Sequence, residues 1–196
     1  MLAKIFSWLG SEVLLGAAIA ILSVFTGLSS YQSSMANSDQ NKYQNQGMKA
    51  LSDANAAFLV ANQYTIYDYS LYDSWAINEE GPKASYYESN FSDELQASIK
   101  ANPDDPFSEG YYAAMEKEAD EKSAESDAKF AIAENFNVRG DELQLVMLIA
   151  AIGLSFAAWA SLLSATSPMR LMFSFMSVVT GIIAFVAYFT VRVVIV

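Results

Sequence analysis

The sequence predicts an all-α integral membrane protein with three transmembrane helices and a helical-hairpin extramembrane domain inserted between the first and the second. Apolar residues are concentrated in two stretches, 13–28 and 143–196. All but one of the 22 acidic residues and all but three of the 11 basic residues lie between them. Such segregation is typical of membrane spans that flank a solvated domain.

The first span is predicted at residues 12–30, whose apolar core carries no charge. Its length is close to the roughly 20 residues that a bilayer requires. Residues 1–11 predict an interfacial amphipathic lead-in, with Lys4 and Trp8 as anchors. A signal peptide cleaved after Ala36 is the competing interpretation. We expect the segment to be retained as a signal-anchor helix.

The second and third spans are predicted at residues 142–164 and 169–191, joined by the short Ser167-Pro168 connection as an antiparallel hairpin. Arg170 and Arg192 would anchor the two ends of the third span. Basic residues flanking the spans are nearly balanced, so the positive-inside rule does not orient the chain. By analogy with other signal anchors, we expect an extracytoplasmic acidic domain on a bacterial inner membrane.

Residues 31–141 form the predicted acidic domain. A helix is expected from Tyr31 to Ile77 with a bend near Gly47 or in the Tyr-rich part, because no Pro interrupts this stretch. Later turn signals delimit a loop at 78–83, a helix at 85–101 with a possible internal start at Ser92, a turn at 102–106 and a helix at 108–137. Gly140 and Asp141 mark either a break before the second span or its interfacial residues.

A stripe at three- and four-residue spacing runs along the first of these helices and predicts the seam along which the helix packs. Asn residues at seam positions can fix helix register and oligomeric state. The stripe comprises Met48, Leu51, Asn55, Phe58, Asn62, Ile66, Tyr69 and Ala76.

An aromatic ridge on the same helix has two interpretations. Tyr and Trp dominate binding hot spots, so the ridge could be a docking surface. We favour a core role, because a small helical domain with few Leu or Val needs aromatic side chains to bury enough area; both hold if the core spans neighbouring protomers. The ridge comprises Tyr64, Tyr67, Leu71, Tyr72 and Trp75, and its expected packing partners are Tyr86, Tyr87, Phe91, Tyr111 and Tyr112.

Small residues recur at helix-packing spacing in two spans. Such rows let transmembrane backbones approach closely, either between protomers or within one bundle, and the sequence leaves both open. The first span carries Gly16, Ala20, Ser23 and Gly27, and the second carries Ala150, Gly153, Ala157, Ser161 and Ser164.

The composition excludes much chemistry. The chain has neither Cys nor His, which removes thiolate sites and the commonest general base and transition-metal ligand. A net charge of −11 argues against nucleic-acid partners. No phosphate-binding loop, dinucleotide motif or metal-ligand spacing is present, and the acidic runs are expected to be solvated. We therefore expect no enzyme activity, no cofactor and no metal.

The run from Ala36 to Gln44 has the pattern Ala-x-x-Asp-x-x-x-Tyr-Gln, and residues 130–144 carry acidic and amide side chains before a Leu-Gln start. Both segments resemble an uncharacterised bacterial family of small membrane proteins, a domain of unknown function, whose pattern is Ala-x-x-Asp-x-x-x-Tyr-Tyr/Gln and whose approach to the second span is similar. The resemblance implies one N-terminal transmembrane helix, a helical segment and a C-terminal transmembrane hairpin. The chain lacks the family's charged N-terminal extension, and the resemblance transfers no activity or site residues.

Together these features predict a non-catalytic membrane scaffold or accessory subunit whose partners are the lipid bilayer and either copies of itself or other membrane-complex subunits. Assembly would use the helical domain and the small-residue transmembrane faces. The alternative is a homo-oligomeric cation channel with an acidic vestibule.

Overall fold

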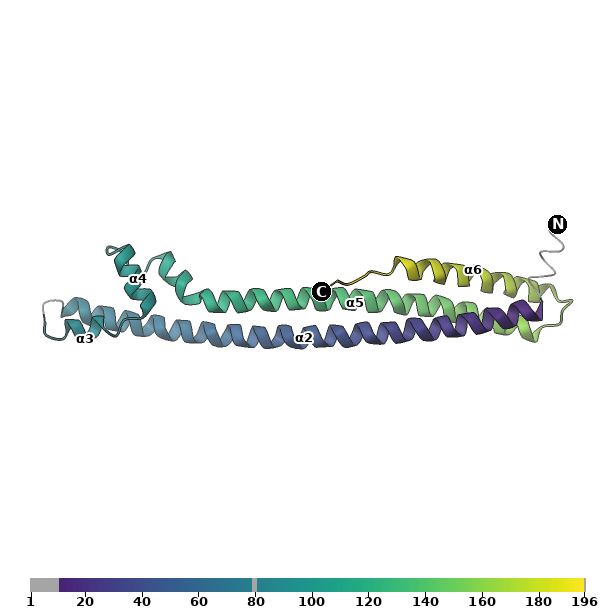
Figure 1. Ribbon diagram of the computed structural model, residues 1–196, viewed down its shortest axis with the longest axis horizontal. Coiled ribbons are helices and arrows are strands. Elements are labelled where there is room, and N and C mark those ends of the chain that lie inside the picture. The colour runs from purple at the N-terminus through teal and green to yellow at the C-terminus, as the bar shows by residue number, and fades with distance from the viewer. Residues whose placement is uncertain (1–10, 79–80, 196) are drawn as a thin grey trace. The chain divides into compact units, whose positions relative to one another are not determined.

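The computed structural model describes residues 11–78 and 81–195, and its regular structure is helical (Figure 1). The predicted all-α class is confirmed for these residues, and α2, α5 and α6 are each long and apolar enough to span a membrane. Apart from Ser11, the lead-in expected at residues 1–11 lies outside the described residues. The helices are α2 (Glu12–Ile77), α3 (Ala84–Glu88), α4 (Asp93–Ala101), α5 (Glu109–Leu162) and α6 (Pro168–Thr190).

Both long helices continue through glycines at which the sequence suggested an interruption. A break at Gly140 is the wrong alternative, since α5 is continuous there, and α2 is likewise continuous at Gly47. The glycines serve close packing instead. A Cβ at Gly140 would lie 2.5 Å from Asn37 Oδ1, and a Cβ at Gly47 would lie 2.9 Å from the Phe130 ring.

The single helix expected at 85–101 is wrong, because this segment forms α3 and α4. The possible start at Ser92 is where α4 begins. Ser92 is the N-cap of α4, and its Oγ accepts a hydrogen bond from the Leu95 amide at 3.0 Å. Its ψ of 158° is extended, as an N-cap requires, so the preceding helix cannot run through this residue.

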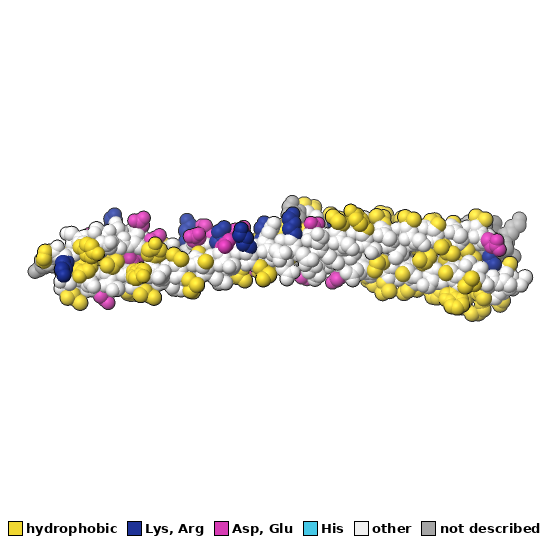
Figure 2. All heavy atoms as spheres, turned by 90° about the horizontal axis from the view of Figure 1, so that it is seen from below, with side chains coloured by type: hydrophobic (Ala, Val, Ile, Leu, Met, Phe, Trp, Pro, Cys, Tyr) yellow, Lys and Arg dark blue, Asp and Glu magenta, His cyan; other side chains and the backbone are white. Residues whose placement is uncertain are grey.

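The chain divides into two compact units. The terminal unit comprises Met1–Tyr43 and Ala131–Val196, and the central unit comprises Gln44–Phe130. Each unit takes part of α2 and part of α5. Hydrophobic side chains gather with few charges over the terminal unit, which contains α6, whereas charged and hydrophobic side chains are interspersed over the central unit (Figure 2).

The terminal unit packs three helices with the seven-residue spacing of coiled coils. Leu22, Ala150 and Ala184, one from each helix, form its buried cluster. The small residues bring the helices together, since a Cβ at Gly153 would lie 2.7 Å from Thr180 Oγ1. The buried rows are Leu15, Leu22, Ser29 and Ala36 on α2; Leu143, Ala150 and Ala157 on α5; and Arg170, Ser177 and Ala184 on α6.

Polar contacts join the three helices at one level of the terminal unit. The Gln32 amide donates to the Tyr188 hydroxyl at 2.8 Å, and the Ser33 hydroxyl donates to the Gly140 carbonyl at 3.1 Å. Just beyond α6, the backbone N–H of Arg192 donates to the Glu142 carboxylate at 2.7 Å. These contacts lie where each apolar helix segment meets polar sequence.

The central unit packs α2 on α5 through a second seven-residue row of small residues. Gly47, Ala54 and Ala61 are buried on α2, and Ser126 of α5 donates its hydroxyl to the Gly47 carbonyl at 2.9 Å. α3 and α4 lie beside the last turns of α2 (Figure 1). Phe91, α4 and the start of α5 form a separate aromatic core with these turns. Its buried members are Phe91, Leu95 and Tyr111.

Candidate functional site

The stripe predicted as a packing seam of α2 is exposed in the central unit, so it is not the contact between α2 and α5, and its role as an assembly seam stays a prediction. One member is partly packed, since the Tyr69 ring stacks on that of Phe107 at 4.2 Å. Around the axis of α2, the centre of the stripe lies roughly 100° from the buried row Gly47, Ala54 and Ala61. The pattern was misleading because the true seam uses Gly and Ala, which allow close helix approach but contribute little apolar signal. We call the exposed residues Met48, Leu51, Asn55, Phe58, Asn62, Ile66 and Tyr69 the outer stripe.

The predicted aromatic ridge divides between core and surface. The rings of Tyr72 and Trp75 lie 6.1 Å and 6.3 Å from that of Phe91, within the aromatic core. Tyr64 and Tyr67 instead remain 55% and 56% exposed. The ridge therefore contributes both to the domain's own packing and to its surface.

The two small-residue rows also have different surroundings. Ala150, Gly153 and Ala157 of α5 are buried among the helices of the terminal unit. Gly16, Ala20 and Gly27 of α2, together with Ser23, are exposed. A Cβ added at Gly16 or Gly27 would meet no described atom within 4 Å.

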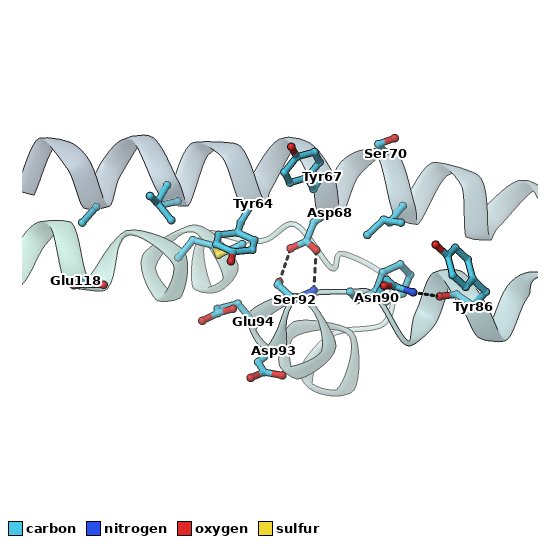
Figure 3. A pocket seen from close by; sticks show the side chains of 16 residues that line it. Tyr64, Tyr67, Asp68, Ser70, Tyr86, Asn90, Ser92, Asp93, Glu94 and Glu118 are labelled. Carbon is cyan, nitrogen blue, oxygen red and sulfur yellow. Dashed lines mark hydrogen bonds between the residues drawn. The ribbon is translucent and has the colours of Figure 1, made fainter.

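A buried carboxylate that was not predicted as a site residue organises the aromatic core. Asp68 of α2 is 2% exposed. It accepts hydrogen bonds from the Ser92 amide at 2.9 Å and from the Ser92 hydroxyl (Figure 3). The Tyr111 hydroxyl donates a third, at 2.8 Å. These bonds join α2 to the start of α4 and to α5, and they compensate the burial of the charge.

Beside this carboxylate is an open groove of about 720 Å³ within the central unit. Tyr64 and Tyr67 line it from α2, Glu118 from α5, and Asp93 and Glu94 from the first turn of α4 (Figure 3). Tyr86 of α3 closes one end. The sequence indicated the two tyrosines of α2 but not the groove, because its other side chains come from α5 and from the α3–α4 corner, which are distant in sequence.

Among residues 11–78 and 81–195, no three acidic side chains are grouped so that they could hold a metal ion. Asp68 has a structural role, because it accepts hydrogen bonds from Ser92, the N-cap of α4. Tyr111 remains protonated at neutral pH. Burial and the hydrogen bond to Asp68 raise the pKa of Tyr111 well above its ordinary value near 10.

This pKa predicts alkaline sensitivity of the central unit. Because folded Tyr111 retains a proton that the unfolded chain loses above pH 10, stability should fall as pH rises beyond about 10. Tyr111→Phe should show a smaller decrease in stability between pH 9 and 11, measured by urea unfolding of the detergent-solubilised protein. Equal pH dependence in the two proteins would contradict this prediction.

No family model, curated protein or solved structure matches the chain. The resemblance to the uncharacterised bacterial membrane family therefore remains a prediction from the two quoted segments.

Proposed function

We propose that the protein is a non-catalytic membrane scaffold that assembles with copies of itself. The observation that carries this proposal is the outer stripe, which leaves large apolar side chains uncovered on a charged unit. Phe58 is 45% exposed and Ile66 is 67% exposed, and the neighbouring Leu59 is 68% exposed. Contiguous apolar surface of this kind is uncommon on solvated monomers and marks interaction sites.

The composition of the outer stripe favours a second copy as its occupant. Asn55 and Asn62 lie among the apolar side chains at a seven-residue interval. Asn side chains can pair with their own copies across a helix interface, where they fix register and oligomeric state. The exposed row of Gly16, Ala20 and Gly27 offers a second surface on which transmembrane helices can approach closely.

The proposal places the three apolar spans of the terminal unit in the bilayer. Residues 31–141, which include the central unit, form a helical extramembrane domain facing the extracytoplasmic side of a bacterial inner membrane. In the 18-residue apolar stretch of each long helix, few residues are buried inside the protein: 17% in α2, 28% in α5 and 17% in α6. Such exposure suits helices that face lipid. Polar contacts at Gln32 and Arg192 suit an interfacial level.

The test is native mass spectrometry of the protein gently solubilised from its own membrane. We expect a single repeating mass, with dissociation in the double variant Phe58→Asp/Asn62→Asp, because two charges would be buried in the interface. Gln63→Asp is the matched control, since Gln63 is exposed outside the stripe. It should keep the wild-type mass.

A monodisperse monomer without partners would overturn the proposal. A set of unrelated subunits would replace self-assembly by the accessory-subunit function that the sequence also predicts. The remaining alternative, a cation channel, requires cation-selective conductance of the purified oligomer in planar bilayers, weakened by neutralising Asp104 and Asp105.

A further inference from the structure

The groove beside Asp68 has the size and lining of a small-molecule site. Its volume of about 720 Å³ lies within the range of roughly 300–1,000 Å³ typical of ligand pockets. Apolar side chains contribute Val60, Leu71 and Met115 to its walls. A ligand with a hydrocarbon body could therefore bury that body here.

The polar lining of the groove selects the charge of its ligand. Asp93, Glu94 and Glu118 contribute carboxylates, whereas none of the described residues that line the groove is Lys or Arg. The rings of Tyr64 and Tyr67 are more than half exposed, and aromatic faces attract cations. Carboxylates and aromatic faces together favour an organic cation.

The arrangement of the carboxylates distinguishes an organic cation from a metal ion. Within the part of the chain that the structure describes, no three acidic groups are placed to chelate a metal. Glu94 and Glu118 come from different helices, α4 and α5. Negative charge is therefore distributed along the groove, which suits several ammonium groups spaced on a chain better than one compact ion.

The groove is also held in shape by the network beneath it. Asp68 fixes the N-cap Ser92, and the two residues after that cap, Asp93 and Glu94, stand at the rim of the groove (Figure 3). Binding groups that are already positioned lose less entropy when a ligand arrives.

We propose that this groove binds an organic amine that carries two or more ammonium groups, of the polyamine class. The inference goes beyond the proposed assembly function and does not depend on it, because the groove lies within one protomer. The site supplies ion pairs from Glu94 and Glu118 and a ring face from Tyr64.

The experiment is isothermal titration calorimetry of the full-length protein in mild detergent, with spermidine as the probe. We expect saturable binding with one site per protomer. Tyr64→Leu should weaken binding about two- to fivefold, whereas Tyr64→Phe, which keeps the ring, should bind nearly as well as the wild type.

Charge variants test whether the groove itself is the site. Glu94→Gln/Glu118→Gln should weaken spermidine binding about tenfold or more. Asp127→Asn is the matched control, because Asp127 is exposed on α5 and does not line the groove. It should bind as the wild type does.

Three results would overturn the proposal. They are no saturable binding of spermidine, an equal loss of binding in Asp127→Asn, or complete displacement of spermidine by Mg²⁺ at the same total concentration of positive charge. The last two would show attraction to a generally acidic surface. Native masses recorded on the same samples keep this test separate from that of assembly, since the groove variants are expected to leave the oligomer intact.

Discussion

Gly153→Leu is expected to destabilise the terminal unit severely. Even a Cβ at this position would lie 2.7 Å from Thr180 Oγ1, 3.3 Å from Leu22 Cδ1 and 3.5 Å from the backbone nitrogen of Gly181. A Leu side chain would have to push α5 away from both α2 and α6. Overpacking of this kind costs about 1–3 kcal/mol or more, so the unfolding midpoint in detergent should fall by roughly 10 °C.

Gly16→Leu is the matched control for this prediction. It introduces the same side chain at a position where a Cβ meets no described atom within 4 Å. The fold should therefore tolerate it, with a midpoint close to that of the wild type. If the Gly16 face takes part in assembly, the same variant should lose the oligomeric mass. Equal thermal destabilisation by the two substitutions would contradict the assignment of Gly153 to the inside and Gly16 to the outside.

Asp68→Ala is expected to be the most damaging single change in the central unit. It leaves the Ser92 amide, the Ser92 hydroxyl and the Tyr111 hydroxyl without their shared acceptor in a buried site. Each unsatisfied buried group costs about 1–3 kcal/mol, so a total loss of roughly 3–5 kcal/mol is expected. The start of α4 would also lose the acceptor that holds its cap.

Hydrogen exchange measures this effect locally. Amides of α3, α4 and the beginning of α5 should exchange much faster in Asp68→Ala, while those of α6 should be unchanged. Asp73→Ala is the control, because Asp73 is an exposed Asp on the same helix and near the same aromatic residues. Similar exchange in the two variants would show that Asp68 does not hold the core together.

The proposed assembly and the proposed amine site use different sides of α2. The outer stripe needs Phe58 and Asn62 uncovered in the protomer, whereas the groove uses Tyr64 on another side of the same helix. Substitutions at Phe58 should change the assembly state without changing amine binding, and substitutions at Tyr64 should do the reverse. A single helix can carry both surfaces because a third side, which contains Ala54 and Ala61, packs inside the unit.

The sequence by itself predicted the all-α class and the location of three apolar helices that are long enough to span a membrane. Charge segregation and uninterrupted apolar runs can be read along the chain without tertiary information, because they depend only on which residues follow one another. The sequence also marked Ser92 as a possible helix start, because a cap is a local interaction, but it did not predict the end of α3 before it.

Only the tertiary structure decided which faces are buried. Large residues such as Phe58 gave the stronger periodic signal, yet the helices pack through Ala54, Ala61 and Gly153. These small residues stabilise packing because they let two backbones approach closely. This effect requires a partner helix that is distant in sequence. The groove could not be predicted for the same reason. Tyr64, Glu94 and Glu118 line one groove only because the hydrogen bonds of Asp68 to Ser92 and Tyr111 hold α2, α4 and α5 together.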